Sequence, residues 1–148
     1  MRPAGFALLC VLLAGCPAPQ QDRSPLADLR KQDGSAPAAD ARPVVLAFWA
    51  DWAPPCSSLL AEMPKLGDKV RVVAAFAGEY RPGVEGRVGG LEFALAGDSL
   101  VRSLGIRVLP TVLVLDRSGA SAARFEGYGP AVVGAVAAVV DSLAASVR

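Results

Sequence analysis

Runs of apolar residues, separated by polar and glycine-rich stretches, predict a sheet and its connecting helices. Five segments predict strands: Pro43–Ala50, Val70–Phe76, Leu91–Leu95, Thr111–Leu115 and Ala122–Glu126. The first is a continuous β-branched and aromatic run, which is typical of a strand buried on both faces of a sheet. The turn signal Asp116–Gly119 between the last two segments predicts an antiparallel hairpin.

Three segments predict helices: Pro55–Leu66, Asp98–Leu104 and a final helix from Gly129-Pro130 to about Val147. In the first helix, Leu59, Leu60 and Met63 are expected to face the core. In the second, Asp98 is expected to cap the helix. The Ala- and Val-rich last helix is interpreted either as completing the core or as pairing with a second copy. Strands that alternate with helices and end in a hairpin predict an α/β fold, with a central mixed β-sheet and helices on both faces.

The first 15 residues have the pattern of an export signal. Arg2 precedes an apolar stretch, Phe6–Leu13, that is too short to span a bilayer as a stable helix. The ending Leu13-Ala14-Gly15-Cys16 resembles the lipobox of bacterial lipoproteins, in which the cysteine is lipidated and becomes the new N-terminus. The resemblance implies a lipoprotein signal peptide over residues 1–15 and an acylated Cys16 that anchors the protein to a membrane. The alternative is an ordinary secretory signal in which Cys16 has no role.

The composition changes after the signal and again near residue 42. Residues 16–41 are rich in Pro, Ala, Gln, Asp and Ser and contain scarcely any large apolar residues. Such a segment buries too little surface to offset the entropy of ordering it. We therefore predict a flexible tether over residues 16–41, with room for one helical turn at Leu26–Lys31, and a folded domain over residues 42–148.

Composition and charge exclude several classes of function. The chain of 148 residues is long enough for one modest core. Its net charge of +1 gives no electrostatic footprint for nucleic acid, so no nucleic-acid partner is expected. The absence of histidine excludes His-ligated metal sites and His-based nucleophilic catalysis. We accordingly expect no metal and no cofactor.

Only one cysteine is a candidate reactive thiol. Of the three cysteines, Cys10 lies within the signal and Cys16 is consumed by the lipid if the anchor forms. Cys56 then remains as the single free thiol. An internal disulfide in the mature chain is excluded on this interpretation.

Three segments resemble thioredoxin-like proteins, especially the membrane-anchored TlpA/ResA group of thiol:disulfide oxidoreductases. Phe48–Cys56 (FWADWAPPC) is similar to their FWA-x-WCPPC motif. Gly105–Thr111 (GIRVLPT) resembles the segment that carries their cis-proline. Asp116–Gly119 together with Gly127-Tyr128 resembles their closing hairpin. The resemblance covers about residues 42–148 and implies a thioredoxin fold.

The chain departs from this family at the centre of its chemistry. Family members use two cysteines, of which the first is an exposed nucleophile at a helix N-terminus and the second resolves the mixed disulfide. Ala53 stands at the first position and Cys56 at the second. Attack on a disulfide requires a thiolate, and release of the mixed disulfide requires another thiol. The complete dithiol cycle is therefore not expected, and Cys56 is either a working thiol or a buried small apolar residue.

The other elements of the family's site are retained. Trp52 and Pro55 are expected to form an apolar rim, whereas Trp49 is expected in the core. The resemblance implies a cis peptide bond before Pro110, which presents the Leu109 backbone to an extended peptide.

Three functions are compatible with these residues. The preferred hypothesis is an exported, lipid-anchored protein on the periplasmic or cell-envelope side, which binds a peptide or protein partner without dithiol exchange. The second is a redox protein that uses Cys56 alone, with an external thiol from a partner to resolve the mixed disulfide. The third is a peroxidase, although Ala53 lacks the threonine hydroxyl that orients peroxide in peroxiredoxins.

Overall fold

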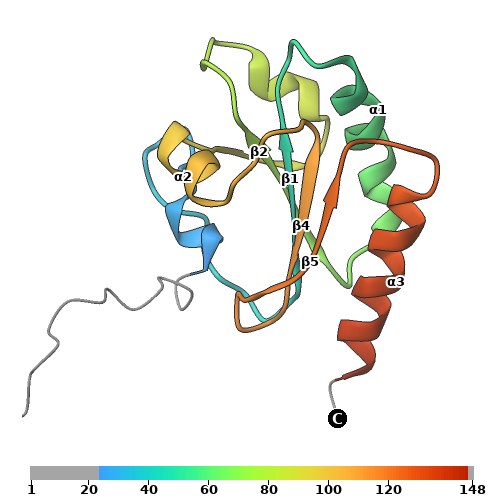
Figure 1. The fold of residues 1–148 in the computed structure, drawn as a ribbon. Coiled ribbons are helices and arrows are strands. Elements are labelled where there is room, and N and C mark those ends of the chain that lie inside the picture. The colour runs from blue at the N-terminus through green and yellow to red at the C-terminus, as the bar shows by residue number, and fades with distance from the viewer. Residues whose placement is uncertain (1–23, 147–148) are drawn as a thin grey trace, which may run out of the picture.

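The five strands form one mixed sheet in the order β3-β2-β1-β4-β5 (Figure 1). The computed structural model describes residues 24–146, so the predicted signal peptide over residues 1–15 and the predicted lipidation at Cys16 lie outside the described residues. The strands are β1 (Val44–Trp49), β2 (Arg71–Phe76), β3 (Glu92–Leu95), β4 (Thr111–Leu115) and β5 (Ser121–Glu126). β1, β2 and β3 are parallel, and β4 and β5 are antiparallel to their neighbours.

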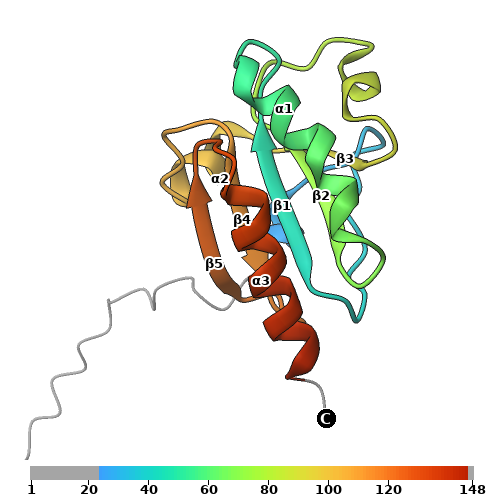
Figure 2. The ribbon, with the colours of Figure 1, turned by 90° about the vertical axis from the view of Figure 1, so that its right-hand side faces the viewer.

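Three α-helices lie on the two faces of this sheet. They are α1 (Pro54–Glu62), α2 (Asp98–Ser103) and α3 (Val132–Ala145). α1 and α3 cover one face, and α2 lies on the opposite face (Figures 1 and 2). The expected α/β fold, with a mixed sheet and helices on both faces, is confirmed.

β1 supplies side chains to a separate core on each face. All of its residues are buried, and successive side chains of a strand point to opposite faces. Val45, Ala47 and Trp49 join the core under α1 and α3. Val44, Leu46 and Phe48 join the core on the face of α2. The continuous apolar run at residues 44–49 thus reflects burial on both faces, as its sequence predicted.

Several helix boundaries differ from the expected ones. α1 ends at Glu62, and a 3₁₀ turn (Met63–Leu66) follows, because Pro64 has no N–H group to donate within a continuing helix. The expected capping by Asp98 is wrong, since Gly97 is the N-cap residue of α2 and no side chain caps it. The final helix begins at Val132, later than expected.

The segment before β1 packs against the domain. Residues 24–42, here called the N-terminal strap, begin with a 3₁₀ turn (Pro25–Asp28). Leu26 and Leu29 from this segment are buried in the core on the α2 face. The Arg30 backbone forms two hydrogen bonds with Leu95, of 3.1 and 2.6 Å, and so pairs with the free edge of β3. The expectation of a flexible tether over residues 16–41 is therefore corrected for residues 24–41, because two leucines find an apolar face that is already formed by the sheet.

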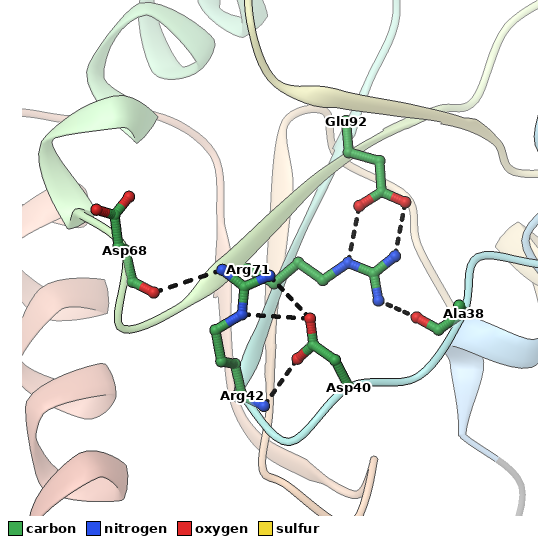
Figure 3. Close-up of polar contacts among 6 residues, drawn as sticks. All are labelled: Ala38, Asp40, Arg42, Asp68, Arg71 and Glu92. Atoms are coloured by element: carbon green, nitrogen blue, oxygen red, sulfur yellow. Dashed lines mark hydrogen bonds and ion pairs between the residues drawn. The ribbon is translucent and has the colours of Figure 1, made fainter.

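A buried cation fastens the far end of the strap (Figure 3). Arg71, the first residue of β2, is 9% exposed, and its guanidinium donates two hydrogen bonds to the Glu92 carboxylate, at 2.7 and 2.6 Å. The same guanidinium donates a third hydrogen bond to the Ala38 carbonyl of the strap. Asp40 and Arg42 form a neighbouring ion pair. Because a buried charge is costly unless it is paired, Arg71 requires both the sheet edge and the strap.

We predict that Leu29→Ala destabilises the domain by about 2–4 kcal/mol, because it removes a fully buried side chain and leaves a cavity. Denaturant unfolding of a soluble form that starts at Ser24 measures this change. Gln32→Ala, at an exposed position of the same strap, is the control and should cost less than about 0.5 kcal/mol. Equal, small effects of both substitutions would show that the strap does not contribute to the folded state.

Candidate functional site

The candidate residues gather where β1 ends and β4 begins. The antiparallel register pairs Phe48 with Thr111, so the chain after Trp49 and the chain before Thr111 lie at the same end of adjoining strands. The last residue of β2, Phe76, pairs with Trp49, and the last residue of β5, Glu126, pairs with Thr111, so both of these strands end at the same place. We call this end of the sheet the site pole.

Trp49 is buried in the core at the site pole. It is 2% exposed, and its ring lies 4.9 Å from the Phe76 ring and 6.5 Å from the Phe93 ring, measured between centroids. Its indole Nε1 is buried and finds no hydrogen-bond acceptor among the described residues. The expectation that Trp49 belongs to the core agrees with this placement.

The first turn of α1 contains Ala53 and Cys56. Ala53 is the N-cap residue and makes no side-chain capping bond, and the next two residues are Pro54 and Pro55, which have no N–H group. The first N–H donor of the helix is that of Cys56, which donates to the Ala53 carbonyl at 3.0 Å. The helix end therefore offers few free N–H groups with which to stabilise an anion.

Cys56 is held in an environment that disfavours the thiolate. Its side chain is 1% exposed and belongs to the core under α1 and α3. Burial raises the pKa of the Cys56 thiol, because removal from water penalises the charged form, and a hydrogen bond with the Ala50 backbone offsets only part of this effect. Among the described residues, no second thiol is present to form a disulfide with it.

The segment before β4 presents backbone groups at the site pole. The Leu109–Pro110 peptide bond is cis, Pro110 is buried and Leu109 is half-buried. The Thr111 hydroxyl donates to the Val108 carbonyl at 2.6 Å, and the Gly127 N–H donates to the Pro110 carbonyl at 2.8 Å. Within residues 24–146, neither the N–H nor the carbonyl of Leu109 has a hydrogen-bond partner. These two groups are free to pair with another extended chain.

Large exposed apolar side chains also collect at the site pole. Of those in the described part of the chain, Trp52 is 71% exposed, Val108 43%, Tyr80 40% and Tyr128 39%. Trp52 follows β1, Tyr80 follows β2, Tyr128 follows β5 and Val108 precedes β4. Pro55 is exposed beside them. Gathered exposed apolar groups mark interaction surfaces more often than scattered ones do.

Sequence reasoning singled out Trp52 and Pro55 but missed Tyr80, Val108 and Tyr128. The two tyrosines lie among glycines, which is a signal of exposed loops. Val108 gave no such signal, because the exposure of a valine two residues before a buried proline depends on tertiary packing.

An ion pair joins the loop after β2 to the loop after β1. The Arg81 guanidinium donates to the Asp51 carboxylate at 2.5 Å, and the Asp51 side chain is only 10% exposed. The pair holds the glycine-rich segment that follows β2 beside the first turn of α1.

No cluster of three or more potential ligands for a metal ion occurs among the described residues. No helix within residues 24–146 is both long and apolar enough to cross a bilayer.

Comparison with solved structures identifies the architecture. A thiol:disulfide interchange protein of the thioredoxin family from Chlorobium tepidum superposes with a TM-score of 0.62 at 21% identity, covering 82% of this chain and 97% of that one. The chain has the thioredoxin fold. A secreted disulfide oxidoreductase from Mycobacterium tuberculosis gives a TM-score of 0.62 at 16% identity, covering 80% and 97% of the two chains. The exposed lipoprotein thioredoxin of Streptococcus pneumoniae gives 0.57 at 20% identity, covering 77% and 96%.

No protein-family model matches the sequence, and no curated protein matches it. The structural neighbours named as thiol:disulfide oxidoreductases agree with the resemblance noted in the sequence, and the expected thioredoxin fold is confirmed. Within that fold the site pole of this chain holds one buried thiol, a free stretch of backbone and an apolar rim.

We predict that Cys56 in the native chain reacts slowly with iodoacetamide up to at least about pH 9, since the raised pKa and burial both reduce the accessible thiolate. The rate should rise sharply when the same protein is unfolded in urea. The matched control is Ser57→Cys in a Cys56→Ala background, which places a thiol at an exposed position of the same helix. Labelling of native Cys56 as fast as this control would contradict the structure.

Proposed function

We propose that this chain is an exported, lipid-anchored thioredoxin-fold protein that binds an extended segment of a protein partner at the site pole without dithiol exchange. The proposal rests on two facts taken together: Ala53 stands at the position of the nucleophile, and the Cys56 side chain is only 1% exposed. A thiol-disulfide cycle requires an accessible thiolate and a second thiol, and neither is available in the described residues.

The mode of binding follows from the free backbone at Leu109. An extended segment pairs with this N–H and carbonyl as an added strand does, and its side chains contact the exposed Trp52 and Val108. Trp52 is the strongest candidate for an energetic anchor, because a large aromatic side chain buries much area on contact. Pro55 is exposed in the first turn of α1, whereas Pro110 is buried and follows Leu109 in the chain.

Two observations count against the redox alternatives. A monothiol mechanism through Cys56 requires exposure and a lowered pKa, whereas burial raises the pKa of this thiol. A peroxidase requires the same exposed thiolate together with a polar group at position 53, and the side chain there is a methyl group. A partner that carries a thiol remains compatible with binding, since recognition at Leu109 does not depend on the partner's redox state.

Location at the cell envelope is proposed from the N-terminal sequence. Residues 1–15 have the pattern of a lipoprotein signal, and Cys16 is proposed as the acylated residue. The proposal is supported by structural neighbours named as an exposed lipoprotein thioredoxin and as a secreted oxidoreductase. The lipid would hold the domain at a membrane on the periplasmic or cell-envelope side.

The first test restores the missing thiol. Wild-type protein should not accelerate the reduction of insulin by dithiothreitol, whereas Ala53→Cys should accelerate it by about tenfold or more, because residue 53 lies at the start of α1 directly before the Cys56 turn. Ala53→Ser is the control and should remain inactive. Activity in the wild type would contradict the proposal. An inactive Ala53→Cys variant would show that more than the nucleophile has been lost.

The second test measures recognition directly. A permanently unfolded probe, reduced and carboxymethylated α-lactalbumin, should bind the wild type, and Trp52→Ala should weaken the Kd by about tenfold through the loss of an aromatic anchor. Titration calorimetry gives both constants. Arg117→Ala, in the turn between β4 and β5, is the control and should leave the Kd unchanged. Identical affinities for wild type and Trp52→Ala would place binding elsewhere.

A further inference from the structure

The segment that leads to the free backbone of Leu109 carries an exposed arginine. Ile106 is buried, whereas the next two residues, Arg107 and Val108, are both exposed. Arg107 stands two residues before Leu109, and two chain steps span at most about 7 Å. An extended segment that pairs with Leu109 therefore runs close to the long side chain of Arg107.

Arg107 has no counter-charge within the described part of the chain. Its guanidinium makes neither a hydrogen bond nor an ion pair with any residue in the range 24–146. An arginine side chain keeps its positive charge at any pH that a folded protein tolerates. The charge beside Leu109 is thus left for solvent or for a bound partner.

The carboxylates nearest to this segment along the sheet are already engaged. Asp51, in the loop after β1, pairs with Arg81. Glu126, at the end of β5, pairs with Arg124 at 3.0 Å, and Arg124 also donates to the Gly105 carbonyl at 2.9 Å. These two ion pairs leave no carboxylate on the strands beside β4 to neutralise Arg107.

Two other charged residues at the site pole also lack partners among residues 24–146, and they lie elsewhere on it. Glu79 and Arg87 belong to the loop between β2 and β3. β2 is two positions from β4 in the sheet, a separation of about 10 Å between the strands. Their charges are opposite, so this loop does not change the balance beside Leu109.

We infer that the partner's segment carries an acidic side chain one or two positions from the residue that pairs with Leu109, and that Arg107 binds its carboxylate. This inference rests on the proposed function, because it concerns the partner of the same site. The planar guanidinium fits a carboxylate through two parallel hydrogen bonds. A lysine at the same place in the partner would be repelled. Arg107 is then a specificity-determining residue, whereas Trp52 supplies affinity for many sequences.

A charge scan of one bound peptide tests this assignment. Overlapping synthetic peptides that cover the α-lactalbumin sequence, with serine in place of cysteine, are titrated with the full chain in a non-ionic detergent. In the peptide that binds most tightly, each position in turn is made Asp, Asn or Lys. At one or two positions Asp should bind about two- to fivefold more tightly than Asn, which is the range of an exposed ion pair, and Lys should bind more weakly than Asn.

Variants of the protein show which residue reads the charge. Arg107→Gln should abolish the difference between Asp and Asn at those positions, and Arg107→Glu should reverse it in favour of Lys. The matched control is Arg117→Glu, which makes the same change of charge in the turn at the other end of β4 and should keep the wild-type preference. Raising the salt concentration should weaken the wild-type preference through screening.

The outcomes separate this inference from the proposed function. A wild-type protein without a preference for Asp, or an Arg107→Gln variant with the wild-type preference, would overturn the inference alone if binding still depends on Trp52. Absence of binding to every peptide, or binding that Trp52→Ala does not weaken, contradicts the proposed function, and the inference fails with it. Thermal unfolding of the Arg107 variants checks that they are folded, as expected for changes at an exposed position.

Discussion

Burial of β1 on both faces is the constraint on which the rest of the structure depends. Its alternate side chains enter two separate cores, and each core needs its own cover. α1 and α3 cover one face, but on the other face α2 has only six residues and covers part of the sheet. Leu26 and Leu29 of the strap complete that second core. The strap is therefore a layer of the fold, and the paired charge of Arg71 secures it at the sheet edge.

The same packing determines the chemical character of the site pole. The first turn of α1 lies against the end of the sheet, and the Cys56 side chain is enclosed between them. Desolvation then favours the neutral thiol, while Ala53 supplies no reactive group in its place. The groups left at the surface are the apolar side chains of Trp52 and Val108 and the free backbone of Leu109. These groups suit recognition of a chain better than transfer of electrons, which is the basis of the proposed function.

Local sequence signals predicted the strand segments and the closing hairpin well, because a continuous β-branched run has few alternatives to a buried strand. They were less accurate at helix ends, where Gly97 rather than Asp98 is the N-cap residue, since the N-cap is fixed by where the backbone changes from extended to helical. The strap was misjudged for a different reason. The tether was predicted from the average composition of the segment, which does not show where single residues pack. Leu26 and Leu29 are buried against a sheet face that is formed by residues far away in the chain. Val108 was missed on similar grounds, because its exposure depends on tertiary packing.

The sequence by itself determined the α/β class, the resemblance to thioredoxin-like proteins and the absence of a thiol at position 53. These properties reside in residue identity and in short-range periodicity, so no tertiary information is required. Only the tertiary structure decided that Cys56 is buried, that four apolar side chains share one pole and that Leu26 and Leu29 are buried in the second core. Desolvation, strand register and the docking of a segment all depend on contacts between residues that are far apart in the chain, and local sequence patterns do not contain them.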